Sequence, residues 1–359
     1  MTESINAAFV GAGFMGRVHA DAVRRAGGRL AAIVGANLEE SAEAAERLGA
    51  ERPYGSLEQV LADDSIDVVH ILTPNFLHAE QAMQVIKAGK HVICEKPLAV
   101  TSQEAESLVA AANDAGVVAA VPFGYRFHPM VREARARLAG KGIHSFEASY
   151  LQDWLAGETD DWRVDSRSGG RSRAFADIGS HLVDMLEFVT GARIVRLTAR
   201  TKIARPMRGG RPVSTEDIAV VVVELDNGAI GTLMVSQVAA GYKNQLSFRI
   251  GTDDETIGFD QQTPNSLWLG RVDAETTIQR DPARLSPDAA RLCTIPSGHA
   301  MGYLDAVAGF VRDVYAAIGG HPAEGTPCFA DGLRAVRITE AVLESAAANQ
   351  WVDVPGTEE

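Results

Sequence analysis

The stretch Gly11-Ala12-Gly13-Phe14-Met15-Gly16 decides the fold of this chain. It follows a short apolar run at residues 7–10, typical of a buried strand, and begins a helical pattern over residues 16–26. In such a turn the first glycine permits a tight bend, the second lets the backbone approach a pyrophosphate, and the third lets the helix pack closely on the strand. The pyrophosphate then lies on helix N-terminal amides. We therefore expect a dinucleotide site that uses Gly11, Gly13, Phe14, Met15 and Gly16.

Strand and helix patterns alternate through the first third of the chain. The expected strands lie at residues 30–34, 68–72, 91–94 and 117–121, and the expected helices at 41–48, 77–88 and 102–115. These helices end at a glycine, and Val/Ile-rich runs follow, which is typical of repeated βαβ units. The sequence predicts a doubly wound parallel sheet, a Rossmann domain, over residues 1–123.

After about residue 145 the pattern becomes that of an antiparallel sheet. Alternating apolar residues predict strands at residues 146–151, 217–225, 230–235, 246–250, 256–259 and 267–269. Asp226-Asn227-Gly228 joins two of them and indicates a hairpin with a type I′ turn. Helices are expected at residues 301–318 and 329–348. The fold class is α/β, with a second, α+β domain over residues 124–359 whose sheet is mostly antiparallel.

The composition disfavours nucleic-acid, metal and membrane partners. The net charge of −13 disfavours a nucleic-acid partner, which would need a basic patch. Three widely spaced cysteines form no Cys-x-x-Cys metal pattern, and no apolar stretch approaches the roughly 20 residues that span a bilayer. The N-terminus lacks a basic and apolar leader pattern. We expect a cytoplasmic protein with no membrane partner and no metal.

Two turns follow strands of the predicted parallel sheet. Thr73-Pro74-Asn75 and His78 come after the strand at residues 68–72. Ligands bind at the carboxyl edge of such a sheet, so Thr73, Pro74, Asn75 and His78 are expected to contact the cofactor. A capped helix start would use Thr73 or Asn75 as well, and the two roles are compatible.

Glu95-Lys96-Pro97 follows the strand at residues 91–94. Pro97 fixes the local backbone and so holds Lys96 in place. An ammonium group there can bind a substrate hydroxyl and stabilise negative charge that develops on its oxygen. Glu95 and Lys96 are therefore expected at the cofactor, and Lys96 at the substrate as a catalytic residue.

Asp177 and His181 are four residues apart, so on a helix they share a face, to which Asp184 also belongs. A carboxylate can orient an imidazole, which exchanges protons near neutral pH. The same spacing suits a capped helix start with a buried structural histidine, and the residues alone leave both readings open. A closed zinc site is disfavoured, because two carboxylates and one imidazole on one helix face make a poor ligand set.

The cofactor type depends on the turn after the strand at residues 30–34. An NAD site usually has an acid there for the ribose 2′-hydroxyl, but here Gly35-Ala36-Asn37 follows and Glu39 is the first acid. A small uncharged turn leaves room for a 2′-phosphate with Asn37 as donor, which favours NADP slightly. No arginine stands beside the turn, and Asn37 or Glu39 could still select NAD.

Five motifs occur in a fixed order along nearly the whole chain. They are Gly-Ala-Gly-Phe-Met-Gly, the Thr-Pro-Asn turn, Glu-Lys-Pro, Tyr125-Arg126-Phe127 and Gly169-Gly170…Asp177-x-Gly179-x-His181. This series resembles the Gfo/Idh/MocA family of glucose–fructose oxidoreductases and inositol dehydrogenases. Two positions depart from the family pattern: Gly35 replaces a frequent acid, and Gly124 a frequent asparagine.

The resemblance implies an NAD(P)-dependent dehydrogenase or reductase that transfers hydride between nicotinamide and a secondary alcohol of a sugar, anhydrosugar or polyol. It implies Lys96, Asp177 and His181 as the catalytic group and a large open sheet that supports homodimers or homotetramers. Arg126, Trp162 and Arg163 are expected at the cofactor. Besides the catalytic group, the substrate residues expected are Tyr125, Trp154 and Arg163. The tryptophans could stack on a pyranose face, and Asp153 and Asp184 could bind hydroxyls.

Two other functions fit the same fold. One is a reductase of non-sugar carbonyls or a dihydrodiol dehydrogenase. The other is a non-catalytic NAD(P)-binding sensor, which has no need to keep Lys96, Asp177 and His181, all present here. The sequence therefore favours the enzyme, and leaves open the sugar, the carbon oxidised, the direction and whether the cofactor stays bound.

Overall fold

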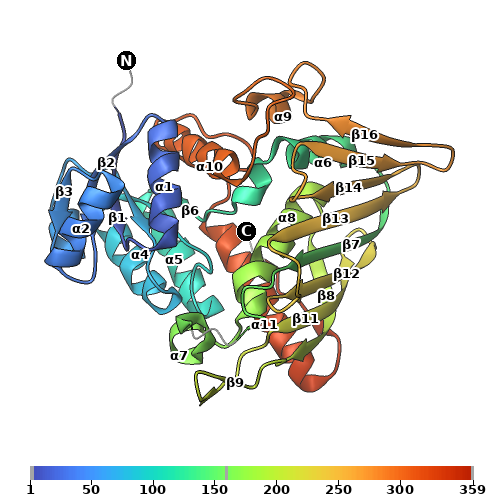
Figure 1. The fold of residues 1–359 in the computed structure, drawn as a ribbon, viewed down its shortest axis with the longest axis horizontal. Helices are drawn as coiled ribbons and strands as arrows, with labels where there is room; N and C mark the ends of the chain where they lie inside the picture. Colours follow the sequence, from blue (N-terminus) through green and yellow to red (C-terminus); the bar gives the residue numbers. More distant parts are fainter. Residues whose placement is uncertain (1–3, 158–160, 357–359) are drawn as a thin grey trace. The chain divides into compact units, whose positions relative to one another are not determined.

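The chain forms two compact units in the computed structural model, which describes residues 4–157 and 161–356 (Figure 1). The first unit comprises the residues up to Gly124 and the segment Tyr303–Leu333. The second comprises Tyr125–Gly302 and the chain from Arg334 onward. A division of the chain at residue 123 would leave Tyr303–Leu333 in the second domain, but this segment packs with the first unit.

The first unit contains a six-stranded parallel sheet in the order β3-β2-β1-β4-β5-β6. Its strands are β1 (Asn6–Val10), β2 (Arg29–Val34), β3 (Arg52–Tyr54), β4 (Val68–Ile71), β5 (His91–Cys94) and β6 (Ala119–Ala120). The order reverses between β1 and β4, which makes their carboxyl ends the dinucleotide-binding edge. The predicted Rossmann sheet is confirmed, and β3 is an addition that the sequence pattern did not indicate.

Helices cover both faces of this sheet (Figure 1). They are α1 (Phe14–Arg25), α2 (Leu38–Leu48), α3 (Leu57–Leu61), α4 (His78–Lys87), α5 (Ser102–Ala115) and α10 (Tyr303–Ile318). Helix α1 packs against α10, and α4 packs against α5. The bounds of α5 match the prediction because Thr101 and Glu104 form a capping box and Gly116 ends the helix in a left-handed conformation.

The second unit contains a nine-stranded sheet in the order β16-β15-β14-β13-β7-β12-β11-β8-β17. Its strands are β7 (Ile143–Leu151), β8 (Ile194–Lys202), β11 (Ile218–Leu225), β12 (Ile230–Ser236), β13 (Gln245–Thr252), β14 (Thr256–Asp260), β15 (Ser266–Gly270), β16 (Glu275–Gln279) and β17 (Val352–Asp353). Only β7 and β12 pair in parallel, so the predicted mostly antiparallel sheet is confirmed. A separate ribbon pairs β9 (Met207–Arg208) with β10 (Arg211–Pro212).

The β11–β12 hairpin is present, but its turn is not the type I′ turn expected. The Gly228 amide donates to the Leu225 carbonyl at 2.9 Å, and the Leu225 amide donates to the Ala229 carbonyl at 2.9 Å. Gly228 is the one loop residue with a positive φ, of 84°. A type I′ turn needs two such residues, whereas this geometry is a type I turn followed by a glycine bulge. The expectation was wrong because Asp226 adds a third residue to the loop.

The helical segments of the second unit are α6 (Pro129–Leu138), α7 (Ser166–Gly169), a π-helical turn (Phe175–Gly179), α8 (Ser180–Thr190), α9 (Pro287–Arg291) and most of α11 (Phe329–Ala348). Short 3₁₀ turns lie at Gly124–Phe127 and Trp162–Val164. Helices α6 and α8 pack on the nine-stranded sheet (Figure 1). Within the described part of the chain, no helix has the length and apolar character needed to cross a bilayer.

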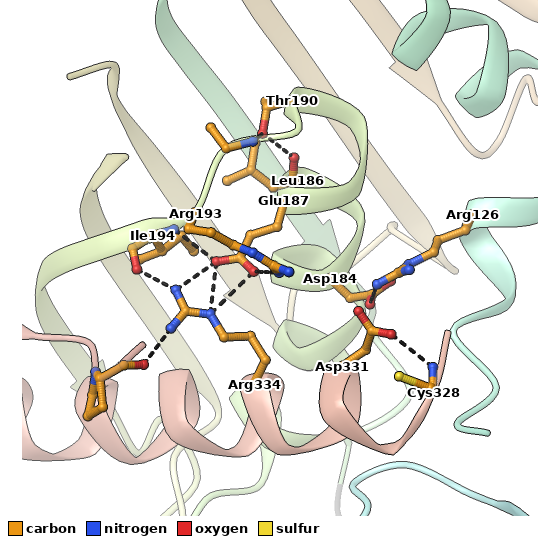
Figure 2. A network of polar contacts seen from close by, with 12 residues as sticks. Arg126, Asp184, Leu186, Glu187, Thr190, Arg193, Ile194, Cys328, Asp331 and Arg334 are labelled. Atoms are coloured by element: carbon orange, nitrogen blue, oxygen red, sulfur yellow. Dashed lines mark hydrogen bonds and ion pairs between the residues drawn. The ribbon is translucent and has the colours of Figure 1, made fainter. Parts of the chain in front are cut away.

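A buried ion-pair network fixes the C-terminal half of α8 (Figure 2). The Glu187 carboxylate accepts from the guanidinium groups of Arg334 at 2.8 Å and Arg193 at 2.7 Å, and from the Ile194 amide at 2.8 Å. Glu187 and Arg334 are almost fully buried. Removing Glu187 would leave the buried Arg334 guanidinium without its carboxylate partner, which is strongly destabilising. Helix α8 is thereby tied to α11 and to the start of β8.

Candidate active site

The glycine-rich turn has the geometry that a pyrophosphate requires. Gly11 has a φ of +97°, and a Cβ there would lie 2.8 Å from the Leu72 carbonyl oxygen, so only glycine fits. A Cβ on Gly13 would meet nothing within 4 Å, which leaves open space where a ligand can approach the backbone. Gly13 also precedes the first residue of α1, whose first turn has no acidic residue and no side-chain cap. Its amides are therefore available to an anion, and the site fits the dinucleotide predicted from the sequence.

The β2–α2 turn contains an acid that the sequence analysis did not consider. Asn37 caps α2 by accepting from the Glu40 amide at 2.9 Å. The Glu40 carboxylate folds back to accept from the Ala36 amide at 3.4 Å and the Asn37 side chain at 3.3 Å. A Cβ on Gly35 would lie 3.0 Å from the Glu40 Cβ, so glycine lets this side chain approach the turn. The Asn-x-x-Glu capping spacing was the available sequence signal.

His78 joins the two turns that follow β4 and β5. Its ring is fully buried, with Nε2 at 2.8 Å from the Thr73 carbonyl oxygen and Nδ1 at 2.7 Å from that of Pro97. Burial lowers the pKa of His78, which the two carbonyls partly oppose. Thr73 is held further by Gln81, to whose side chain its hydroxyl donates at 2.6 Å. His78, expected at the cofactor, therefore holds both turns in the protein interior, and Pro74 and Asn75 begin the 3₁₀ turn Asn75–Leu77 beside Thr73.

Lys96 lies two residues after the end of β5, on the same carboxyl edge of the sheet. Its backbone amide donates to the Glu95 carboxylate at 3.1 Å. Glu95 is buried, while Lys96 is partly exposed. In the first unit the structure thus places the Gly11–Gly16 turn, the Thr73 turn and Lys96 at the ends of adjacent strands.

Asp177 and His181 lie across a junction between two kinds of helix. Asp177 is in the π-helical turn Phe175–Gly179, and His181 is the second residue of α8. A Cβ on Gly179 would lie 2.7 Å from the Phe175 ring, so glycine permits this winding. The sequence predicted an ordinary helix here, and π-helical turns occur frequently at functional sites.

Glu216 holds the start of this π-helical turn. Its buried carboxylate accepts from the Ser172 hydroxyl at 2.6 Å, the Arg173 amide at 3.1 Å and the Phe175 amide at 2.9 Å. These donors would otherwise be unsatisfied at a buried helix start. Asp177 and His181 are therefore carried on a segment that is anchored on both sides, by Glu216 and by Glu187.

Asp184 does not share the role suggested by its spacing. Its buried carboxylate forms a bidentate ion pair with Arg126, whose Nε donates at 2.8 Å (Figure 2). Arg126, expected at the cofactor, has this internal acid as its partner within the second unit. Asp153, another acid expected for sugar hydroxyls, pairs with Lys243 at 2.7 Å.

A hydrogen-bonded network surrounds the two catalytic candidates of the second unit. Gln237 is fully buried and donates to the Asp177 carboxylate at 2.7 Å. The ring of His181 stands edge-on to Tyr125, with centroids 5.1 Å apart. The Tyr125 hydroxyl lies 2.6 Å from that of Tyr150, and burial raises the pKa of Tyr125. The structure therefore brings the expected substrate residue Tyr125 against His181.

The aromatic residues expected at the substrate also gather together. The Arg163 guanidinium lies 4.5 Å from the centroid of the Trp162 ring and 5.9 Å from that of Trp154. The Trp154 indole donates to Gln152 at 3.0 Å. Gln152 in turn donates to Asn244 at 2.7 Å, and Asn244 bonds the hydroxyls of both Tyr125 and Tyr150.

Sequence reasoning missed three polar residues of this network, Tyr150, Gln237 and Asn244. The sequence signal that could have indicated them was their position, because each lies near the end of a strand that the alternating pattern predicted. As for metals, the described residues contain no group of three or more His, Cys, Asp or Glu side chains placed to hold an ion.

Family models match both parts of the chain. Residues 5–123 match the NAD-binding Rossmann fold of the Gfo/Idh/MocA oxidoreductases, and residues 132–257 match a C-terminal domain of the same proteins. The chain belongs to the Gfo/Idh/MocA family. It is an NAD(P)-dependent oxidoreductase that acts on CH–OH groups, as the sequence predicted.

Several relatives match this Gfo/Idh/MocA protein over nearly its whole length. Levoglucosan dehydrogenase of Pseudarthrobacter phenanthrenivorans is 33% identical, covering 98% of the chain and 99% of the relative. A 1,5-anhydro-D-fructose reductase of Ensifer adhaerens is 29% identical, covering 93% of each. The structure of a levoglucosan dehydrogenase complexed with NADH and levoglucosan superposes with a TM-score of 0.92 at 32% identity, covering 99% of the chain and all of that structure. This complex holds NADH, which gives no support to the expected preference for NADP.

The contact between Gln237 and Asp177 can be tested in this family member. Replacing Gln237 with Leu removes a hydrogen bond to a carboxylate, worth about 1.5–3 kcal/mol. We expect kcat to fall by about tenfold or more, measured as NADH formation at 340 nm. Gln245→Leu is the matched control, because Gln245 donates to Asp260 at 2.7 Å on a neighbouring strand. Equal kcat values for the two variants would contradict a role for Gln237 in holding Asp177.

Proposed function

We propose that this protein is an NAD-linked dehydrogenase of an anhydrosugar or a related pyranose. Lys96, Asp177 and His181 are its catalytic group. The observation that carries the substrate class is the cluster of Trp154, Trp162 and Arg163, which hydrogen bonds connect to the tyrosine beside His181. Two full-length relatives named for anhydrosugars support the same class.

The residues of this chain divide the reaction between them. The amides after Gly13 hold the pyrophosphate, and NAD⁺, when bound, accepts the hydride of the carbinol. His181 takes the proton of the hydroxyl, and Asp177 orients the imidazole and stabilises its charged form. Lys96 donates a hydrogen bond to the same oxygen and stabilises negative charge that develops there. The reverse direction reduces the corresponding ketone.

The substrate-binding part of the proposal rests on aromatic stacking. Indole faces suit the apolar C–H face of a pyranose, and the Arg163 guanidinium supplies donors to ring hydroxyls. Gln237 already uses its amide on Asp177, which keeps that carboxylate aligned for His181.

The catalytic assignment predicts the behaviour of two variants. With levoglucosan, other anhydrosugars, glucose and myo-inositol as the panel, Lys96→Ala and His181→Asn should each lower kcat by about 10²–10⁴-fold. For His181→Asn, the NADH affinity, read by intrinsic fluorescence, should stay within about threefold of the unmodified protein, because His181 is assigned to the substrate hydroxyl and not to the cofactor. Lys87→Ala and His321→Asn, at exposed positions, serve as controls. Near-normal kcat in either active-site variant would contradict the assignment.

Selection of NAD over NADP is assigned to Glu40. Its carboxylate lies against the Gly35–Asn37 turn, where the ribose 2′-position is read in this fold. A carboxylate accepts from a 2′-hydroxyl and repels a 2′-phosphate. The acid therefore comes from the first turn of α2 instead of from the end of β2.

Glu40→Ala tests this assignment. NADH should bind about tenfold more weakly, because a hydrogen bond to a charged group is lost, and NADPH should bind more tightly. The measurement is a fluorescence titration with both cofactors. Glu39→Ala, one position away on the same exposed turn, should change neither affinity by more than about twofold. An unchanged ratio of the two affinities in Glu40→Ala would exclude Glu40 as the selector.

The outer face of the nine-stranded sheet is proposed to mediate self-association into homodimers or homotetramers. Val220 and Met234 are opposite each other on β11 and β12, and both are exposed together with Val222 and Ile230. Exposed large apolar side chains on one face of a sheet are typical of an interaction surface.

Light scattering after size exclusion tests this surface. Val220→Glu combined with Met234→Glu should shift the protein to a monomer, because two charges would be buried without partners. Val272→Glu is the control, since Val272 is fully exposed in the connection between β15 and β16. A monomeric unmodified protein, or a double variant that still associates, would contradict the proposal.

A further inference from the structure

Four titratable side chains form a continuous buried chain next to Lys96, all within the first unit. The Tyr315 hydroxyl (α10) lies 3.2 Å from His70 Nε2 (β4). His70 Nδ1 lies 2.9 Å from His19 Nδ1 (α1), and His19 Nε2 lies 3.1 Å from Glu95 Oε1. Both histidines are 0% exposed, and Glu95 and Tyr315 are each 6% exposed.

The hydrogen bonds of this chain have a single direction when Glu95 is ionised. A carboxylate only accepts, so His19 must donate from Nε2. A neutral His19 then accepts at Nδ1, which requires His70 to donate from its own Nδ1. His70 therefore accepts at Nε2, and the Tyr315 hydroxyl donates to it. Every donor points toward Glu95, and such aligned bonds strengthen one another.

The surroundings favour the neutral forms of His70 and Tyr315. Burial lowers the pKa of His70 well below its usual value, and burial raises the pKa of Tyr315. The Phe9 ring packs on both histidines, with centroids 5.0 Å from His70 and 6.3 Å from His19. An isolated charge on either ring would be costly in this apolar environment.

We propose that Tyr315, His70 and His19 keep Glu95 ionised and fixed beside Lys96, so that His19 and His70 are positioning residues for this lysine. The second oxygen of Glu95 accepts from the Lys96 amide, so the position of the carboxylate determines how the backbone leaves β5. The inference rests on the proposed catalytic role of Lys96. It assigns a role to His19 on α1, His70 on β4 and Tyr315 on α10. None of these three residues needs to contact the substrate or the cofactor.

Three other titratable groups act on this hydrogen-bonded series of side chains: Cys94, His78 and Asp67. Cys94 precedes Glu95 and has a pKa well above its usual value because of burial, so it stays a neutral thiol. His78 faces Glu95 from α4, and burial lowers its pKa. Asp67 is the acid that acts on Tyr315, and it raises the pKa of that phenol further.

A pair of substitutions at His19 separates positioning from packing. His19→Leu removes the donor to Glu95 and should lower kcat by about 10–100-fold, because a bond to a charged group is lost. In His19→Leu, the acid limb of the kcat–pH profile should move to higher pH. The reason is that the Glu95 carboxylate has fewer hydrogen-bond donors and is therefore protonated more easily. His19→Gln keeps a donor at the Nε2 position and should recover most of kcat. NADH affinity should stay within about twofold in both.

If His19→Leu does not fold, Tyr315→Phe provides the same test with the ring retained. It removes the last donor of the chain and should lower kcat by about threefold with a smaller shift of the acid limb. Unchanged kcat and unchanged pH profiles in His19→Leu, or in Tyr315→Phe where the former is unfolded, would overturn the proposal. An equal loss of kcat in His19→Leu and His19→Gln would also overturn it, because packing alone would then explain the effect.

A spectroscopic measurement keeps this test separate from the proposed function. In the full-length protein with ¹⁵N-labelled histidine, His19 should give the shifts of the Nε2–H tautomer and His70 those of the Nδ1–H tautomer, assigned with His19→Gln and His70→Gln. The opposite tautomers would exclude an ionised Glu95 at the end of the chain. Correct tautomers together with a fully active Lys96→Ala variant would instead reject the catalytic role of Lys96 while leaving the chain intact.

Discussion

The close approach of the Gly11 turn to the end of β4 is the constraint on which the first unit depends. A side chain at Gly11 would collide with the Leu72 carbonyl, so β1 and β4 can end side by side only with glycine there. The same contact places the start of α1 and the Thr73 turn at one edge of the sheet. Lys96 follows because β5 is the next strand along that edge.

The second unit achieves comparable precision by a different means. Two buried carboxylates, Glu216 and Glu187, hold the ends of the segment that carries Asp177 and His181. Each accepts from backbone amides as well as from side chains, so the helical segment is anchored to neighbouring loops and strands. Catalytic geometry on a helix requires such support, because small displacements of the reacting groups cost large factors in rate.

Much of this architecture could be predicted from local patterns. The glycine turn, the strand alternation and the helix caps depend on residues close in sequence, and α5 was bounded correctly because both of its caps are local. What escaped prediction depends on distant partners. The π-helical turn depends on Glu216, about forty residues away, and Asp184 is occupied by Arg126 from another element. Position along a helix predicted a shared face, but could not predict which carboxylate already had a buried cation.

The placement of Tyr303–Leu333 has a consequence for how this protein can be divided. The polypeptide passes from one unit to the other three times, after Gly124, Gly302 and Leu333. A fragment that stops at Gly124 would therefore lack α10, expose the face of α1 that packs on it, and strip His70 of its phenolic partner. The first unit is therefore not a continuous segment of the chain that recombination could move intact into another protein. Its core is completed only by residues that follow the whole Tyr125–Gly302 segment, so the first unit cannot finish folding before that segment has been synthesised.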